Sequence, residues 1–332
     1  MFRSFLYWSS SVIVSMINMI LSLFGYLFHG SYKIPSPRES PSNQLQKLMM
    51  NRARFRLLHL DYVAIREVLN SLDPIDYINF SRASKSCKTL STMKKSYKVC
   101  LTIKTCPMLK IGNGVINYAV LWTKEKKEDK TRMLRTWPNE ARECVFEYSE
   151  NPLGAMKEFY MHARSLMGID IDCVVLFMDD FGEQFREIVY WLNSTFREIP
   201  AIRVYGKNQQ QINVQYILDN VKYKDSLKLY VKTVEMLPPE IPDTIKELRI
   251  GYGSWITLDY LMSLKMCKFA LLDTYLTNED INFFFKSWMQ MKSHNNLERF
   301  EVNLTNPEDF VAIGLRDIPY EMGPTTSAPF LL

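Results

Sequence analysis

Cysteine and histidine, the residues that most often bind zinc, are scarce and scattered in this sequence. The 332 residues include six cysteines and four histidines, and no Cys-x-x-Cys pair or His-Glu-x-x-His motif occurs. Zinc-finger and RING-type arrangements are therefore excluded. We expect the cysteines to be reduced and mostly buried thiols, as is usual in a cytosolic protein.

An excess of charge of one sign is also lacking. The 41 Lys and Arg against 36 Asp and Glu give a net charge of +5, which is spread along the chain without a basic block. So weak and diffuse a charge does not predict nucleic acid as a partner.

Motifs of catalysis and of cofactor binding are missing as well. No serine lies in a Gly-x-Ser-x-Gly elbow, and Gly112-Asn-Gly114 lacks the third glycine of a dinucleotide site, so it predicts a hairpin turn. The one notable acidic pair is Asp179-Asp180, where Asp180 is expected to cap a helix rather than bind a metal. We predict no catalytic residue, metal or cofactor, and a hydrolase with an unfamiliar site is the remote alternative.

The first 32 residues hold the longest apolar stretch. Ser4 to Tyr32 contains no Asp, Glu, Lys or Arg, and as a helix it could cross about 30 Å of hydrocarbon. No Ala-x-Ala-like cleavage site follows it, so we predict an uncleaved membrane anchor at residues 5–28, with the rest of the chain in the cytoplasm. An apolar extension without a membrane role is the alternative. Residues 33–54, rich in proline and serine, are predicted to form a linker.

Residues 55–95 predict three short helices in tandem. Val63, Ile65 and Val68 begin an apolar stripe at mostly helical spacing, and Asp73-Pro74 is typical of a helix start. Forty residues bury too little surface to be stable alone, so the apolar side chains need a partner protein or the rest of the chain.

The stretch LLHLDYVAIREVLNSLDPIDYINFSRASKSCK resembles the F-box of the F-box B group of nematode proteins. This resemblance implies binding to the Skp-type adaptor of cullin-based ubiquitin ligases. It departs from the usual motif at Asp61, where Leu-Pro is expected and Leu60-Asp61 occurs. The alternative is an ordinary helical hairpin of the domain core. Some apolar residues of this motif must face its own core. The candidates for contact with the adaptor are Leu60, Val63, Ile65, Val68, Leu69, Leu72, Pro74 and Ile78.

Residues 99–305 predict an α/β body in which short strands recur. Aligning the second apolar position of six strands gives Leu176, Val204, Leu229, Ile250, Leu271 and Val302, at steps of 28, 25, 21, 21 and 31 residues. Most steps fall in or near the period of leucine-rich repeats, whose units bury their edges by stacking in order. The predicted fold class is thus α+β or α/β, with a three-helix F-box motif before an irregular leucine-rich-repeat-like domain. An ordinary α/β sandwich is the alternative, and residues 306–332 are predicted to be a surface tail.

Alternation along these strands predicts one exposed face rich in aromatic residues and arginine, the types enriched at binding hot spots. We expect this face to bind a protein substrate. The predicted substrate-binding residues are Phe177, Arg203, Tyr205, Lys228, Tyr230, Arg249, Arg299 and Glu301.

The second half of the chain carries another resemblance. NPLGAMKEFY at residues 151–160, SWITLDYLMSL at 254–264 and LTNEDINFFFKSWMQMKSHNNLERFEVNL at 276–304 are similar to the type 2 F-box-associated domain of the same nematode group. Together the two resemblances imply a non-catalytic, substrate-recruiting subunit, bound through the Skp-type adaptor to a cullin. An adaptor-independent scaffold protein, held at a membrane by residues 5–28, is the rival hypothesis.

Overall fold

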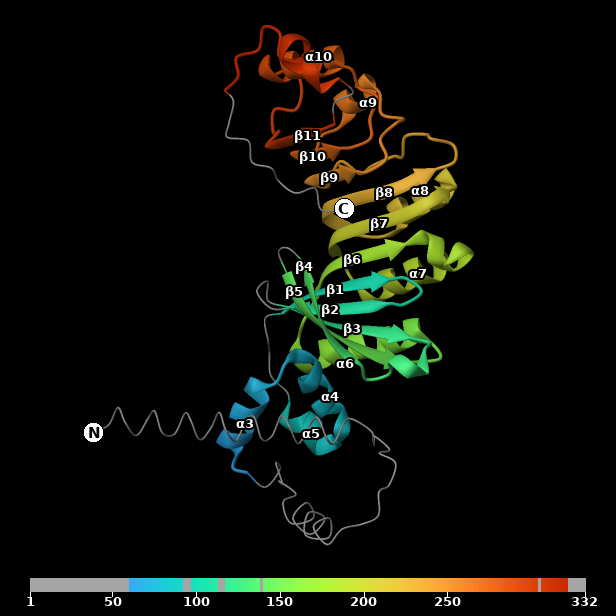
Figure 1. Cartoon of the computed structure of the whole chain (residues 1–332), viewed down its shortest axis with the longest axis vertical. Helices are drawn as coiled ribbons and strands as arrows, with labels where there is room; N and C mark the ends of the chain where they lie inside the picture. Colours follow the sequence, from blue (N-terminus) through green and yellow to red (C-terminus); the bar gives the residue numbers. More distant parts are fainter. Residues whose placement is uncertain (1–59, 92–96, 113–116, 138–139, 304–305, 322–332) are drawn as a thin grey trace, which may run out of the picture.

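The structure, a computed structural model, describes residues 60–91, 97–112, 117–137, 140–303 and 306–321. It is a mixed α/β fold in which three short helices adjoin one end of a long sheet (Figure 1). The predicted anchor at residues 5–28 and the predicted linker at 33–54 lie outside the described residues. Among the helices of the described part, none is both long and apolar enough to cross a membrane.

The three predicted helices before the sheet are present, and each begins at a residue that suits a helix start. Asp61, Asp73 and Ser84 each accept a hydrogen bond from a backbone N–H in the first turn of the helix that follows. Pro74 stands at the first position of the second helix, where its missing N–H costs nothing. The helices are α3 (Tyr62–Ser71), α4 (Pro74–Ala83) and α5 (Lys85–Leu90).

The described residues form one sheet of eleven strands, in the order β11-β10-β9-β8-β7-β6-β1-β2-β3-β5-β4. From β6 to β11 the strands are parallel, and each lies beside the next in the chain. The strands are β1 (Lys98–Ile103), β2 (Met108–Gly112), β3 (Asn117–Thr123), β4 (Arg132–Trp137), β5 (Glu140–Tyr148), β6 (Ile171–Phe177), β7 (Ile199–Gln209), β8 (Tyr223–Thr233), β9 (Glu247–Ile250), β10 (Lys268–Leu271) and β11 (Arg299–Val302).

The register of the six parallel strands is the one that the apolar spacing predicts. The aligned residues are direct partners across the sheet, from β6 to β11: Leu176, Val204, Leu229, Ile250, Leu271 and Val302. The first five of these side chains are buried. The predicted alignment is therefore confirmed. The register is fixed because a shift by one residue would turn every apolar side chain of a strand to the opposite face.

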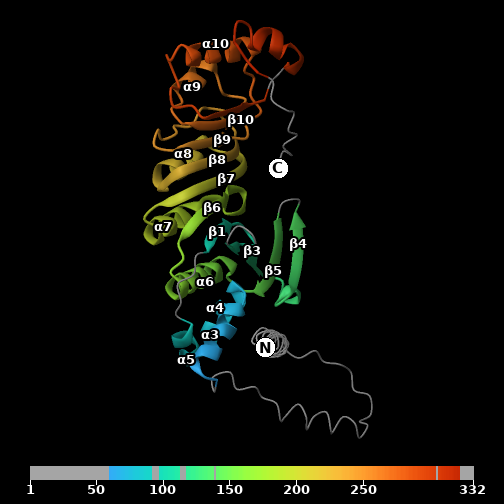
Figure 2. The same cartoon turned by 90° about the vertical axis from the view of Figure 1, so that its left-hand side faces the viewer.

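The helices of the body pack on one face of the sheet and leave the other without a helix from the described part (Figure 2). These helices are α6 (Pro152–Met167), α7 (Phe185–Thr195), α8 (Gln211–Asn220), α9 (Leu258–Ser263) and α10 (Asn278–Met289). Short helical turns are η2 (Lys126–Glu128), η3 (Met178–Asp180), η4 (Gly182–Gln184), η5 (Pro307–Asp309) and η6 (Phe310–Gly314). We call the sheet face opposite the helices the outer face.

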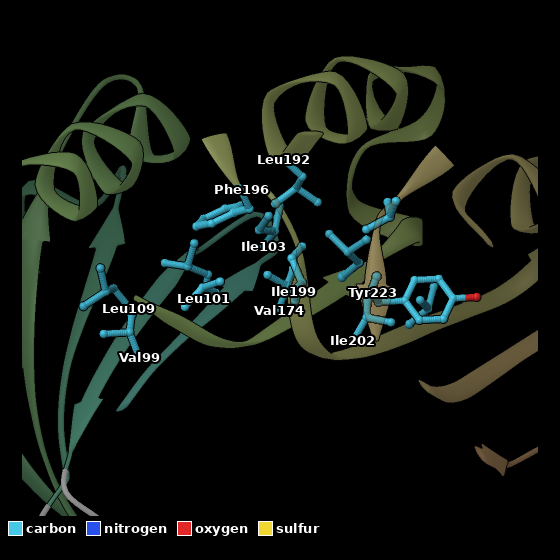
Figure 3. Close-up of a cluster of buried hydrophobic side chains, with 14 of the residues drawn as sticks. Val99, Leu101, Ile103, Leu109, Val174, Leu192, Phe196, Ile199, Ile202 and Tyr223 are labelled. Atoms are coloured by element: carbon cyan, nitrogen blue, oxygen red, sulfur yellow. The ribbon is translucent and has the colours of Figure 1, made fainter. Parts of the chain in front are cut away.

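The main core lies between the helices and the sheet. Figure 3 shows part of it, where Leu101 and Val174 of neighbouring strands meet Leu192 of α7 and Phe196 directly after it. The cluster also contains buried side chains of α3 and α4, such as Leu69 and Ile78. The three helices therefore share one continuous hydrophobic core with the body.

β2 and β3 pair antiparallel as far as Gly112 and Asn117, as a hairpin at this point requires. Neither β2 nor the β4–β5 pair is predicted from the sequence. One local prediction needs correction. Asp180 does not cap α7, because its carboxylate accepts a hydrogen bond from the backbone N–H of Thr105. Part of the predicted surface tail contacts α10, where Asn282 donates hydrogen bonds to the carbonyls of Gly314 and Arg316.

Candidate interaction surfaces

The predicted adaptor-binding residues lie mostly inside the molecule. Six of them are buried: Ile65, Val68, Leu69, Leu72, Pro74 and Ile78. In this structure the body and the neighbouring helices cover these six residues, so their contact with an adaptor stays a prediction. Val63 is 69% exposed and Leu60 is half-buried at the edge of the core.

Polar contacts also fasten the three helices to the body. The Ser81 hydroxyl of α4 lies 2.7 Å from Nε2 of His162 on α6. The Arg82 guanidinium stands 5.7 Å from the ring centroid of Phe159, on the same helix of the body. Burial, together with the cations Arg82 and Lys88, lowers the pKa of His162. The lowered pKa favours the neutral imidazole, which can form a hydrogen bond with a hydroxyl.

Arg132, at the start of β4, is a second link between the helices and the sheet. Its guanidinium lies 3.5 Å from the carboxylate of Asp73, 2.8 Å from that of Glu143, and also pairs with Asp76. Burial and the neighbouring Asp73 raise the pKa of Asp76 to about 6, against the attraction of Arg132. Two carboxylates at the start of α4 therefore depend on one guanidinium from a strand more than fifty residues away.

α3 exposes two large side chains in its first turn. Tyr62 and Val63 expose 62% and 69% of their surface, and the guanidinium of Arg66 stands over the Tyr62 ring at 5.7 Å from its centroid. Asp61, which departs from the expected proline, has a local role: Oδ1 accepts a hydrogen bond of 2.9 Å from the N–H of Ala64. These residues form what we call the α3 tip.

All eight predicted substrate-binding residues share the outer face. Arg203, Lys228 and Arg249 are direct partners across β7, β8 and β9, and Glu301 lies in the same row beyond Ala270. Arg299 lies two residues before Glu301 on β11 and thus on the same face.

Three aromatic rings form a second row on this face, two residues further along the strands. Phe177, Tyr205 and Tyr230 are register partners in β6, β7 and β8. The first two rings are stacked with centroids 4.9 Å apart and planes 10° apart, and the last two at 4.9 Å and 9°. We call these three residues the aromatic ladder.

Salt bridges neutralise only part of the charged row. Lys228 Nζ lies 3.2 Å from Glu247, and Arg249 Nη1 lies 3.3 Å from Glu301, which also pairs with Arg299. Arg203 is exposed and has no carboxylate partner among the residues that the structure describes. The cation beside the ladder is thus available to a ligand.

Two residues at the ends of the ladder are missing from the sequence-based prediction. Lys104, just after β1, places Nζ 5.9 Å from the centroid of Phe177. Gly251 follows β9, and a Cβ there would lie only 2.4 Å from Cδ1 of Tyr230. The spacing of the aligned strands could have predicted that Gly251 lies beside Tyr230. The position of Lys104 next to Phe177 depends on the pairing of β1 with β6, which no local pattern predicts.

No group of three or more His, Cys, Asp or Glu residues capable of holding a metal ion occurs within the described ranges. The described part of the fold is a small helical module at one end of a long sheet with one open face (Figure 1).

Comparison with family models identifies both parts. The model of the F-box domain matches residues 57–99, and the model described as F-box associated matches residues 238–302. The chain therefore carries an F-box domain followed by an F-box-associated domain of type 2, as the sequence predicts. The nematode origin is not tested and stays a prediction. No curated protein and no solved structure matched the chain.

Proposed function

We propose that this protein is the substrate-recognition subunit of a cullin-based ubiquitin ligase, in which the F-box binds a Skp-type adaptor and the body recruits a protein target. The observation that carries the proposal is the occurrence of both domains in one chain, since F-box proteins with such a domain typically have this role. The subunit performs no bond chemistry. It raises the local concentration of the target near the enzyme that transfers ubiquitin.

The shared core gives this proposal a physical basis. If the F-box were joined to the body by a flexible linker, a bound target would occupy many positions relative to the adaptor. Here the core of α3 and α4 is continuous with that of the sheet, and Ser81–His162 and Arg132 add polar links. The body would thus hold a target in a defined direction relative to the adaptor.

The stacked strands suit a target-binding body, and we propose that β6–β11 are irregular leucine-rich-repeat-like units. Each strand lies beside its successor in the chain, as the units of solenoid proteins do. The rows of exposed side chains on such a sheet form an extended surface, which is the kind that repeat proteins use for binding.

We propose that the adaptor binds at the α3 tip, where Tyr62 and Val63 enter the interface and Leu60 lies at its border. Burial of the other six predicted contacts supports this proposal, and those residues of α3 and α4 would support the exposed ones from behind. An adaptor that needs the buried residues themselves would first have to separate the helices from the body.

A binding assay with the purified Skp-type adaptor tests this assignment. The variant Val63→Asp adds a charge at an exposed site and is expected to abolish adaptor binding without unfolding the chain. Ile212→Asp, at a site on α8 that is equally 69% exposed, is the matched control and should bind as the wild type does. A wild-type chain that does not bind the adaptor would overturn the proposal and favour the adaptor-independent scaffold. Equal loss in both variants would overturn the assignment to the α3 tip.

A further inference from the structure

The aromatic ladder presents the edges of its rings rather than their faces. The outward faces of the two end rings are covered, because Lys104 stands over Phe177 and the backbone at Gly251 lies against Tyr230. The inner faces are stacked on one another. What remains for a ligand is a row of three ring edges with two phenol hydroxyls, and neither hydroxyl has a hydrogen-bond partner in the described part of the chain.

Ring edges carry the positive end of the aromatic quadrupole. They attract anionic oxygens and the faces of other aromatic rings, which meet them in an edge-to-face arrangement. A ligand that suits the ladder therefore combines negative charge with an aromatic group.

The charges around the ladder favour the same ligand. Arg203 lies on the same face two residues before Tyr205, and the exposed Lys232 lies two residues after Tyr230. Together with Lys104 these cations surround the three rings, and none has a carboxylate partner among the described residues. On β9 to β11 the cations Arg249 and Arg299 are paired with Glu301 instead. Unpaired positive charge is thus concentrated beside the rings.

The size of this patch corresponds to a short segment of protein. Three neighbouring strands span about 10 Å at a spacing of roughly 4.8 Å. That distance equals about three extended residues, each of which advances the chain by roughly 3.3 Å.

We propose that the outer face of β6–β8 binds a short, acidic, aromatic-containing segment of a target protein. Arg203 holds a carboxylate of this segment through charge-assisted hydrogen bonds, and the aromatic ladder holds the neighbouring ring across its edges. The inference rests on the proposed function, in which this face recruits the target. Nucleic acid is the less suitable occupant, because bases bind by stacking on ring faces, and those of the ladder are covered.

The test uses fluorescein-labelled random copolymers with the full chain, in a fluorescence anisotropy titration. The probes are poly(Glu,Tyr), poly(Glu) and poly(Lys,Tyr). We expect poly(Glu,Tyr) to bind at least about tenfold more tightly than poly(Glu), a difference of about 1.4 kcal/mol, and poly(Lys,Tyr) not to bind. Equal binding of poly(Glu) and poly(Glu,Tyr) would overturn the inference, since charge alone would then explain the affinity. So would tighter binding of a single-stranded oligonucleotide.

Matched charge reversals locate the site. Arg203→Glu should weaken poly(Glu,Tyr) binding by at least about tenfold, as expected for loss of a charge-assisted contact. Arg186→Glu makes the same change on α7, on the helix side, and should leave binding nearly unchanged. Equal effects of the two variants would overturn the inference.

The same preparations are tested for adaptor binding, which separates two failures. Adaptor binding without poly(Glu,Tyr) binding rejects this inference alone. Poly(Glu,Tyr) binding without adaptor binding rejects the proposed ligase role and leaves the peptide site supported.

Discussion

The Ser81 hydroxyl of α4 and the His162 imidazole of α6 lie 2.7 Å apart and join the F-box domain to the body. The two residues are 81 positions apart in the chain, and the contact lies beside the shared hydrophobic core. It makes the attachment of the F-box sensitive to the charge of one side chain.

Protonation of His162 should therefore destabilise the protein. Its pKa in the folded state is lowered by burial and by Arg82 and Lys88, so the folded state favours the neutral ring. The stability from the neutral ring is complete above the ordinary pKa of about 6.5 and is lost as the pH falls through the lower folded value. We expect the free energy of unfolding, measured with urea, to fall between pH 7.5 and pH 5.5 more for the wild type than for His162→Gln. Other titrating groups are common to both proteins, so an equal fall in the two would contradict the prediction.

Arg132 should be more important at high pH than at low pH. Replacement by Gln leaves Asp73 and Asp76 close together without their shared cation. Since the Arg132 side chain is about one-third exposed, we expect a cost of about 1–2 kcal/mol at pH 8. The pKa of Asp76 is raised to about 6, so its carboxylate takes up a proton below that pH. Protonation relieves the repulsion, and the cost measured by urea unfolding at pH 5 should be smaller.

The exposed pair Lys265–Asp243 offers a control for Arg132. Both side chains are more than half exposed, so Lys265→Gln should change the free energy of unfolding by less than about 0.5 kcal/mol at either pH. An Arg132→Gln variant that behaves like this control would show that the cluster contributes little to the attachment of the F-box.

A methyl group at Gly251 should disturb the aromatic ladder. The Cβ of Gly251→Ala would lie 2.4 Å from Cδ1 of Tyr230, so the ring has to move. We expect a loss of about 1–3 kcal/mol in the free energy of unfolding, as for other overpacked sites. Removal of the ring makes room for the methyl group, so the double variant with Tyr230→Ala should lose less than the sum of the two single losses. Additive losses would mean that the ring and the glycine do not oppose each other.

The carboxylate of Asp61 should stabilise α3, whereas a proline at this position should favour adaptor binding. Its side chain caps α3, so Asp61→Ala should cost roughly 1 kcal/mol of stability, and Asp61→Asn less, because Asn is also a good cap. Asp61→Pro loses the cap in the same way but restores the residue that the F-box usually has there. We expect it to bind the Skp-type adaptor more tightly than Asp61→Ala at equal stability. Weaker binding would indicate that the carboxylate itself contacts the adaptor.

Several elements could be predicted because they depend on neighbours in the sequence. The cap at Asp73 is a short-range hydrogen bond, and it forms at the predicted start of α4. The row from Leu176 to Val302 follows from alternation, since each strand must turn its apolar side chains to the helices. The outer-face positions of Tyr205 and Tyr230 follow for the same reason.

Only the tertiary structure shows which surfaces pack against one another. Whether Leu69 and Ile78 face a partner or the body depends on how α3 and α4 dock, and an apolar stripe is the same in both cases. The stripe predicts that these residues are covered, and only the tertiary structure shows that the body covers them. Residues from distant parts of the chain also come together in the pairing of β4 with β5, in the ion pairs of Arg132 and in the contact between Ser81 and His162. Local sequence therefore determined the elements and the faces, and the pairing of those faces was determined by the burial of apolar surface throughout the chain.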